Sequence, residues 1–287
     1  MARKYRCFEN GDMEKFEAEA KIALLATISE SRQPHLTFLS SLQAKTTNTL
    51  MFGQFSEGLS KKHVKWNPNA GFLIMSLERE LWRGKARWTH EVGEGDDFEY
   101  FNRKPMFRYN AYFGIHTVHY LTLIEVSRRQ RLPLPGIVAG SLKTLVARGG
   151  ARSGRGGGRD VSPVLTPWAE SLFRRLDTLK FLSWIESDGY PTIVPVLQCQ
   201  AADPGRLVFT PTPFSQDLEA LEAGTSVAVF GLSMQIENVL VRGIFTGFRR
   251  RRGIRLGHID LEWAYNSMPP VPGQIYPPVP LEPVLES

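Results

Sequence analysis

The residues whose types and spacing could carry out chemistry stand near position 60. Ser60, Lys61 and Lys62 open a segment, 58–66, whose pattern predicts a short helix. The first turn of a helix has unpaired backbone N–H groups and a positive dipole end, and both attract an anion. A phosphate monoester carries nearly two negative charges near neutral pH and needs fixed donors. The three residues therefore predict a phosphate-binding turn.

The same lysines have an alternative interpretation. Lysine is common on protein surfaces, where its ammonium group is simply solvated. Taken alone, Lys61 and Lys62 fit this ordinary surface role better than a binding role. The elements around the turn are what favour an anion site.

No other group of residues in the sequence predicts a catalytic or metal centre. The histidines lack metal-ligand spacing, and His116 and His119 would point to opposite faces of one predicted strand. We therefore expect core or surface histidines. The acidic residues of 94–99 predict a loop or a helix start. Since the sequence also has no G-x-S-x-G elbow, P-loop or dinucleotide fingerprint, it assigns no catalytic residue and no metal ligand.

Composition bounds the class of protein. A chain of 287 residues, 42% hydrophobic and 22% charged, predicts two globular domains with a real core. The two cysteines, Cys7 and Cys199, exclude a disulfide scaffold and a cysteine-based zinc site. They indicate free thiols of a reducing cytoplasm. The apolar runs are too short to span a bilayer, and the N-terminus has no secretory pattern. We expect a cytoplasmic protein without a membrane partner.

The net charge of +6 comes from two local segments. One is a glycine-rich run, 147–159, and the other lies within 249–255. Without the nine arginines of these two segments the rest of the chain carries a net charge of −3. A solvated linker and a solvated hairpin turn explain this distribution better than a nucleic-acid-binding face. The arginines are Arg148, Arg152, Arg155, Arg159, Arg249, Arg250, Arg251, Arg252 and Arg255.

The chain contains an internal repeat. Residues 23–36 align without a gap with residues 180–193, at an offset of 157. The first half carries about twenty additional residues, which we place between Thr89 and Gly114. The alternation of apolar segments and turn residues keeps the same order in both halves, which predicts a duplicated domain. At the same offset 50–52 and 70–73 match 207–209 and 227–230, and Trp82-Arg83-Gly84 matches Val241-Arg242-Gly243 after a shift of two.

Each half is predicted to be mostly β, and a set of short strands with few helices favours a small antiparallel barrel. Between the halves, the Gly/Arg-rich composition predicts a flexible connector. We therefore expect domains at 1–140 and 163–287 joined by a linker at 141–162. Strands are predicted at 22–28, 35–42, 49–53, 70–77, 81–88 and 117–126, and helices at 13–21, 58–66, 96–103, 167–180 and 215–223.

The ordered set of elements resembles the FMN-binding split barrels related to pyridoxamine phosphate oxidase. The resemblance covers residues 13–126, with a weaker copy at 168–263. It implies a mainly β protein with two tandem split barrels that form an intrachain pseudo-dimer, and a homodimer in addition is left open. The matching segments are Ala23-Leu-Leu-Ala-Thr-Ile28, His35-Leu-Thr-Phe-Leu39, Leu50-Met-Phe-Gly53, the Ser/Lys turn, Asn67-Pro-Asn-Ala-Gly-Phe-Leu-Ile-Met75 and Arg83-Gly84-Lys85-Ala86.

The resemblance also implies a cofactor. In the family, residues matching Ser60, Lys61 and Lys62 hold the FMN phosphate, and Gln54 is expected near the flavin ring or ribityl chain. The interval from Ser60 to Asn67 is shorter than in the family, which leaves open which lysine matches the phosphate position. The implied function is an FMN-dependent oxidoreductase acting on a small-molecule substrate that the sequence does not identify. No segment matches the substrate-binding C-terminal motif of pyridoxamine phosphate oxidase itself.

The second half departs from the pattern at the phosphate turn. At the offset of 157, Asp217, Leu218 and Glu219 replace the serine and the two lysines. Carboxylates repel phosphate, so we expect a degenerate second barrel without this site. Two alternatives to a flavin enzyme stay open. One is a haem-binding split barrel, for which His258 is the candidate axial ligand, and the other is a cofactor-free binding or assembly module.

Overall fold

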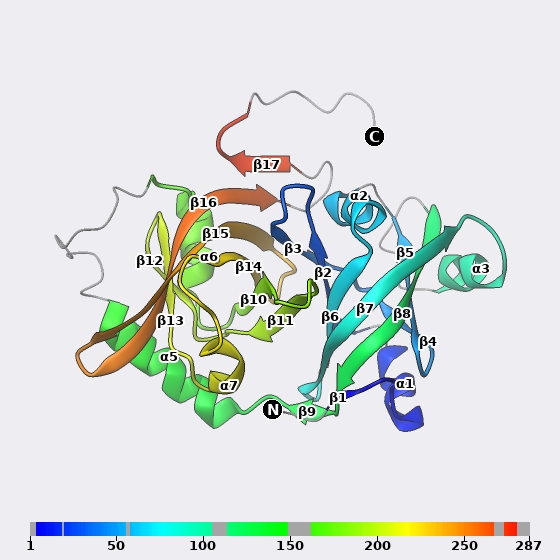
Figure 1. Cartoon of the computed structure of the whole chain (residues 1–287), viewed down its shortest axis with the longest axis horizontal. Coiled ribbons are helices and arrows are strands. Elements are labelled where there is room, and N and C mark those ends of the chain that lie inside the picture. The colour runs from blue at the N-terminus through cyan, green and yellow to red at the C-terminus, as the bar shows by residue number, and fades with distance from the viewer. Residues whose placement is uncertain are drawn as a thin grey trace. The chain divides into compact units, whose positions relative to one another are not determined.

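The protein is described by a computed structural model that covers residues 4–18, 20–55, 58–104, 114–148, 162–266 and 273–279. The chain forms two compact units. Unit 1 comprises Met1–Leu132 and Ile185–Ile193, and unit 2 comprises Pro133–Trp184 and Val194–Ser287. One antiparallel sheet forms the centre of each unit (Figure 1). Among the described residues, no helix is long and apolar enough to cross a membrane.

The elements of the first half follow the predicted order. They are β1 Lys4–Tyr5, α1 Asn10–Phe16, β2 Lys21–Ile28, β3 Pro34–Phe38, β4 Gln43–Thr46, β5 Thr49–Gln54, α2 Leu59–Trp66, β6 Asn69–Ser76, β7 Glu80–Val92, α3 Asp96–Arg103, β8 Thr117–Ser127 and β9 Gln130–Arg131.

The second half repeats this series after an additional helix, α5. Its elements are α5 Leu134–Arg148, α6 Pro167–Arg174, β10 Leu179–Ile185, β11 Pro191–Pro195, β12 Gln200–Asp203, β13 Arg206–Phe209, α7 Ser215–Leu218, β14 Ser226–Leu232, β15 Asn238–Arg251, β16 Ile254–Asn266 and β17 Gly273–Tyr276.

The two sheets have the same strand order. The first runs β3-β2-β6-β7-β8-β5-β4, and the second runs β11-β10-β14-β15-β16-β13-β12. In the first unit a single core cluster draws side chains from β2, β4, β5, β6, β7 and β8, so the sheet curls around it as a barrel. The two edge strands of each sheet follow one another in the chain. They are β3 and β4 in the first sheet and β11 and β12 in the second, and this strand order defines a split barrel. The predicted duplication and the mainly β class with two split barrels are confirmed. The pseudo-dimer stays a prediction.

Both copies have a glycine at the same position of an equivalent strand, Gly84 in β7 and Gly243 in β15. A Cβ on Gly84 would lie 2.1 Å from the carbonyl oxygen of Glu125, and a Cβ on Gly243 would lie 2.1 Å from that of Asp260. Both ladders shift register beside this glycine. Because no side chain fits where the neighbouring backbone approaches so closely, both strands need glycine there.

The hairpin turn between β10 and β11 contributes residues to unit 1. The buried ammonium of Lys85 lies 2.5 Å from carboxylate oxygens of both Glu186 and Asp188, and 3.3 Å from Glu125. The hairpin also packs without space for a side chain, because a Cβ on Gly71 would lie 2.1 Å from the carbonyl oxygen of Pro191. A buried cation and a backbone contact therefore fix the turn within this unit.

Several predicted boundaries differ from the structure. The strand predicted at 35–42 is β3, which ends at Phe38, because a turn follows in which Leu42 N–H donates to the carbonyl of Leu39 before β4 begins at Gln43. The helix predicted at 13–21 is α1, which ends at Phe16 because Lys21 already pairs with Ser76 in the sheet. The helices predicted at 167–180 and 215–223 are shorter, since strand pairing begins at Leu179 and α7 is a single turn. The remaining strands predicted in the first half lie in β2, β5, β6, β7 and β8.

Helix α5 was not predicted. It passes through position 140, where we placed the end of the first domain, and it includes residues 141–148 of the predicted linker. Its buried residues, Ile137, Gly140, Thr144 and Ala147, recur at helical spacing. Gly140 brings the helix close to the turn that follows β13, because a Cβ there would lie 2.9 Å from the carbonyl oxygen of Thr212. Residues 149–161 of the linker lie outside the described residues.

Candidate functional site

The predicted site residues lie at the end of β5 and at the start of α2. Gln54 is the last residue of β5, and Ser60, Lys61 and Lys62 lie in the first turn of α2. Ser60 and Gln54 are buried, Lys61 is half-buried and Lys62 is exposed. The helix contacts β2 and β3, which fixes its start relative to the barrel.

The start of α2 combines donors with a positive charge. Its N-cap residue is Gly58, which has no side chain to cap the helix. Among the described residues, the Ser60 hydroxyl oxygen has no hydrogen-bond partner, although the residue is 1% exposed. The Lys61 ammonium lies 3.7 Å from where a Cβ on Gly58 would stand. A cation therefore lies against the positive end of a helix whose first turn also holds a buried hydroxyl, and an anion would stabilise this arrangement.

Of the two lysines that the sequence left equivalent, the structure brings Lys61 to this position. Lys62 is exposed on α2, and within the described ranges it forms no ion pair. The Lys61 charge also acts on the neighbouring cluster, because it helps to lower the pKa of His119. Lys61 is thus the better candidate for a phosphate ligand.

Gln54 belongs to a buried hydrogen-bonded chain that connects three strands. Its side-chain oxygen Oε1 lies 2.7 Å from His119 Nε2, on β8. The indole Nε1–H of Trp88, on β7, donates to His119 Nδ1 at 3.2 Å. His119 therefore accepts at Nδ1 and donates from Nε2, and it stacks on Phe52 with ring centroids 4.7 Å apart. Since the Gln54 oxygen accepts from His119, the side chain can offer a ligand its NH₂ donor.

The electrostatics keep His119 neutral. Burial lowers its pKa to about 4, and the nearby Lys61 and Lys65 charges act in the same direction. Glu91 opposes them, with its carboxylate 3.4 Å from His119 Nδ1. Glu91 is also paired with Lys65 at 2.7 Å. The site therefore combines a neutral imidazole with cations at its edge.

The inner face of α2 is held by a second polar contact. His63 Nδ1 lies 3.2 Å from the Thr27 hydroxyl on β2. The His63 ring meets the His35 ring edge-on, with centroids 5.0 Å apart. These buried histidines position the helix. Throughout the described ranges, no three His, Cys, Asp or Glu side chains are grouped so that they could hold a metal ion.

The equivalent region of the second barrel is apolar. The β5–β8 ladder pairs Phe52 with His119, and the β13–β16 ladder pairs Phe209 with Gly257. By the same comparison of ladders, Phe245 and Phe248 stand where Trp88 and Glu91 stand in the first barrel. These rings and Phe209 pack together with centroids 5.1–6.0 Å apart. A Cβ on Gly257 would lie 2.6 Å from Phe209, so the aromatic side chains fill the space that the polar chain occupies in the first copy.

The acidic turn of the second copy is also in place. Asp217 lies in the first turn of α7, and Leu218 is buried in the core. His258, the candidate haem ligand, is buried in β16, and burial together with nearby arginines lowers its pKa to about 4. Its Nδ1 has no hydrogen-bond partner among the described residues.

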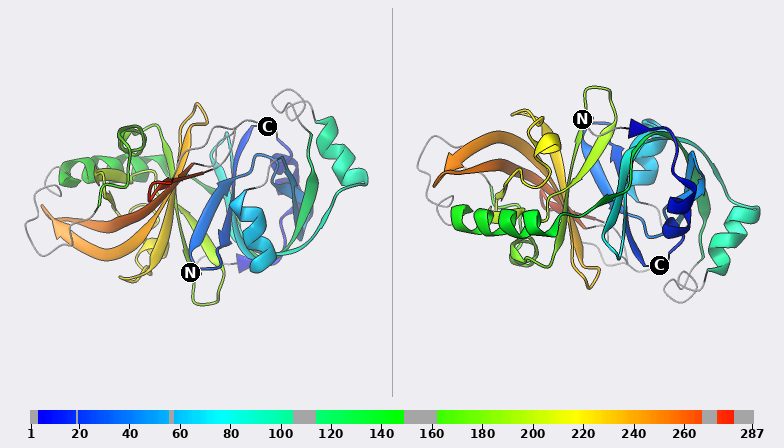
Figure 2. Two further views of the ribbon diagram at one scale, coloured as in Figure 1. Left: turned by 90° about the horizontal axis from the view of Figure 1, so that it is seen from above. Right: turned by 90° about the horizontal axis from the view of Figure 1, so that it is seen from below.

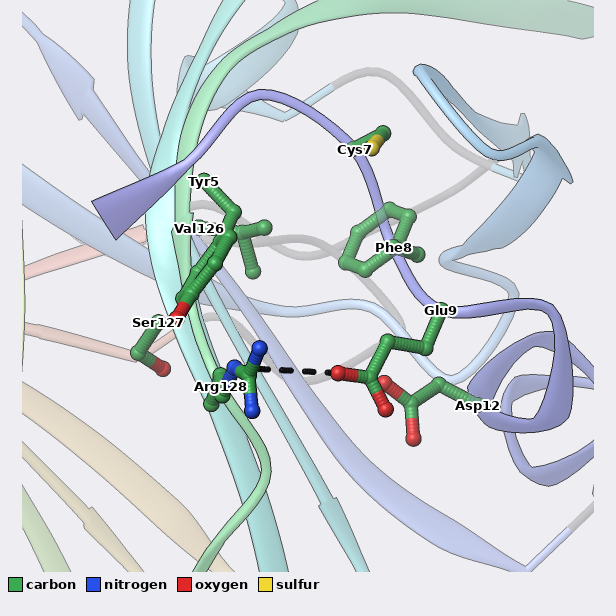
Figure 3. A pocket seen from close by; sticks show the side chains of 8 residues that line it. All are labelled: Tyr5, Cys7, Phe8, Glu9, Asp12, Val126, Ser127 and Arg128. Atoms are coloured by element: carbon green, nitrogen blue, oxygen red, sulfur yellow. Dashed lines mark ion pairs between the residues drawn. The ribbon is translucent and has the colours of Figure 1, made fainter. Parts of the chain in front are cut away.

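A cavity of about 250 Å³ lies elsewhere in unit 1 (Figure 3). Two of its charged side chains are paired with each other, since Arg128 faces Glu9 at 3.7 Å, and Arg128 also lies over the Tyr5 ring at 4.7 Å. None of the predicted site residues lines it. The lining residues are Tyr5, Cys7, Phe8, Glu9, Asp12, Val126, Ser127 and Arg128.

The sequence alone did not indicate His119, Trp88 or Glu91 as site residues. His119 was expected to be a core or surface histidine, because the spacing of the histidines gives no indication of a site. The three residues meet through strand pairing, on β7 and β8, which are separated by α3. The repeat could have indicated them. When the paired strands of the two barrels are compared, His119 corresponds to Gly257 and Glu91 corresponds to Phe248, so the polar residues occur in the first copy alone.

Comparison with solved structures finds similarity over somewhat less than half of this chain. An FMN-binding protein from Syntrophomonas wolfei is 11% identical with a TM-score of 0.35, and the match covers 40% of this chain and 80% of that one. A putative pyridoxamine 5′-phosphate oxidase from Lactobacillus delbrueckii is 14% identical with a TM-score of 0.34, covering 42% and 94%. The Group A Streptococcus protein HupZ is 14% identical with a TM-score of 0.35, covering 42% and 92%.

No protein-family model matches the sequence, and no curated protein is similar to it. The split-barrel fold follows from the strand order repeated in the two halves.

Proposed function

We propose that the first barrel binds the phosphate of a flavin mononucleotide at the start of α2 and that the protein is a flavin-dependent oxidoreductase. The observation that carries this proposal is the buried Ser60 hydroxyl, which has no partner among the described residues. It lies in the first turn of a helix whose next residue, Lys61, places its ammonium near the N-cap residue Gly58. A buried hydroxyl without a partner is costly, and an anion at this helix end would supply the missing acceptor.

The roles of the individual residues follow from their chemistry. Ser60 would donate its hydroxyl hydrogen to a phosphate oxygen, and Lys61 would neutralise part of the phosphate charge. Gln54, held by His119, would present its NH₂ group to a flavin acceptor. A bound flavin supplies the transfer of electrons or hydride, so the chain needs no charged general base of its own. The neutral state of His119 keeps a further positive charge away from the interior.

The proposal is tested by comparing FMN with riboflavin, which lacks the phosphate. We expect the protein to bind FMN and to quench its fluorescence. Riboflavin should bind at least about tenfold more weakly, because charge-assisted hydrogen bonds contribute ~1.5–3 kcal/mol each. Ser60→Ala and Lys61→Ala should each weaken FMN binding by about tenfold and leave riboflavin binding unchanged. Fluorescence titration of each variant with each ligand gives these affinities.

Lys62→Ala is the matched control, since it removes the neighbouring but exposed lysine. Its affinity for FMN should stay within about twofold of the unsubstituted protein. Equal binding of FMN and riboflavin would contradict the phosphate site. A red-brown protein with a Soret band and no flavin uptake would favour haem instead.

A further inference from the structure

Helix α5 has an apolar face that the described part of the protein leaves exposed. Its buried side faces β12, β13 and β16 of unit 2, whereas a row of large apolar side chains follows the opposite side at intervals of four residues. We call this row the α5 ridge. Its members and their exposed fractions are Leu134 at 38%, Val138 at 58%, Leu142 at 58% and Val146 at 54%.

The outward face of α5 is unusual for a surface helix. Surface helices normally turn charged or polar residues to solvent. The helix has two charged residues, Lys143 and Arg148, and the Arg148 guanidinium donates to the Gln200 side chain of the same unit at 3.0 Å. Lys143 is therefore the single charge that α5 presents outward along the ridge. A row of exposed apolar side chains on one helix face is a candidate interaction surface when a second binding feature adjoins it.

A cluster of cations lies at the end of this ridge. The end of β15 and the turn that follows it carry four consecutive arginines, Arg249–Arg252, which we call the arginine turn. The Arg252 guanidinium donates to the carbonyl oxygen of Val146 at 3.1 Å, so the turn adjoins the last residue of the ridge. Within the described ranges none of the four is paired with a carboxylate, whereas the nearby Arg255 is paired with Glu219 at 2.8 Å. Figure 2 shows the β15–β16 hairpin and α5 from two sides.

We propose that the α5 ridge and the arginine turn bind the surface of an anionic lipid bilayer, with α5 lying in the plane of the interface. Apolar side chains on one helix face enter the boundary of the acyl chains, while adjacent cations pair with acidic headgroups. The surface offers both features side by side, and its charge is complementary to an acidic membrane. Such a surface does not require a membrane-spanning helix. The sequence-based expectation of no membrane partner considered spanning segments and a secretory signal, and it did not consider a helix that lies on the membrane surface.

Two other occupants fit the surface less well. A nucleic acid would pair its phosphates with the arginine turn, but its charged backbone would not be stabilised by a row of leucine and valine side chains. A second copy would need about 800 Å² from each partner for a stable interface. A helix of 15 residues is about 22 Å long and about 10 Å wide, so the ridge alone covers on the order of 200 Å².

The proposal is tested by flotation of the full-length protein with vesicles. We expect binding to vesicles of phosphatidylcholine mixed with phosphatidylserine and no binding to phosphatidylcholine alone. Val138→Ser/Leu142→Ser should reduce the bound fraction at least about fivefold, because it removes apolar groups from the interface. Arg249→Gln/Arg250→Gln should reduce binding and weaken its dependence on salt.

Matched controls are Leu77→Ser/Met234→Ser and Arg6→Gln/Arg103→Gln, which change exposed residues of the same kinds elsewhere. Both controls should float like the unsubstituted protein, and circular dichroism should show that all variants are folded. The proposal is overturned if no vesicle binding occurs, or if the ridge variant binds as well as the controls. It is also overturned if the protein binds RNA in place of vesicles, or if light scattering shows a dimer that the ridge variant abolishes.

Discussion

His119 is held in its neutral form by the residues around it. Burial and the charges of Lys61 and Lys65 lower its pKa to about 4, although Glu91 favours protonation. Protonation would also put a hydrogen on Nδ1, where the Trp88 indole donates. Folding and the orientation of Gln54 therefore both depend on an imidazole that stays uncharged.

The first prediction at this scale concerns pH. In the unfolded chain His119 has an ordinary pKa of about 6.5, whereas in the folded chain the pKa is about 4. Because the folded value is the lower one, the contribution of His119 to stability is complete above about pH 6.5 and is lost as the pH falls toward 4. Between pH 7 and pH 5 the unfolding free energy should fall by about 2 kcal/mol less in His119→Gln than in the unsubstituted protein. Urea denaturation at the two pH values measures it.

The control for this experiment is His116→Gln, which changes an exposed histidine close in sequence. Its loss of stability between the two pH values should match that of the unsubstituted protein. If His119→Gln shows the same acid loss as this control, then His119 is not the neutral buried group described.

Single residues were predicted where the reason was local. Ser60 and Lys61 could be proposed from the sequence because a helix start offers donors and attracts anions within a few residues of sequence, and their role in binding stays a prediction. The sequence could not decide between Lys61 and Lys62, since that choice depends on which ammonium lies over Gly58. Trp88 and His119 could not be found in this way, because the contact between them is made through the pairing of β7 with β8.

At the scale of elements, the turn between β10 and β11 depends on Lys85. The ammonium is buried among three carboxylates, and two of these carboxylates belong to the turn. These carboxylates raise the pKa of Lys85 above its ordinary value, and Lys85 in turn lowers that of Asp188. Both groups thus stay charged near neutral pH.

Replacing Lys85 with Met should lower the unfolding free energy by about 1–3 kcal/mol. A fully buried pair would lose ~3–5 kcal/mol, but the Glu186 and Asp188 side chains are 35% and 51% exposed and can be rehydrated. The amide of Gly189, which donates to Glu186 within the turn, should exchange its hydrogen faster. Denaturation and hydrogen exchange measure the two effects.

Arg103→Gln is the control for an ion pair that is mostly exposed, because its partner Glu99 and Arg103 itself both face solvent. Little change is expected from this variant. Unaltered stability and exchange in Lys85→Met would contradict the role given to the buried cation.

The helices and strands were predicted best where a segment of apolar residues is clearly bounded by turn residues. The strands of the first half lie close to their predicted positions, because each has a pattern of apolar residues bounded by turn residues. The helices at 13–21 and 167–180 were predicted too long, since propensity cannot show where strand pairing takes over. Helix α5 was missed because its buried face consists largely of small residues, with Gly140 packed closely against the turn that follows β13.

At the scale of the whole molecule, the duplication has produced two copies that differ in chemistry. The strand order is the same, but the first barrel has the polar chain of Trp88, His119 and Gln54 and the second has packed phenylalanine rings. The repeat predicted this architecture from sequence. It also showed that the second copy lacks the Ser/Lys turn, since Asp217, Leu218 and Glu219 align with Ser60, Lys61 and Lys62. The account therefore predicts one flavin site per chain.

The most direct test is the amount of flavin that one chain binds. The protein should be saturated with FMN, freed of excess ligand, and its absorption near ~450 nm compared with its protein concentration after heat release of the flavin. The account predicts one FMN per chain, and little or none for Ser60→Ala/Lys61→Ala. A protein that takes up no FMN would contradict the flavin site, and two FMN per chain would contradict the assignment of the site to the first barrel alone.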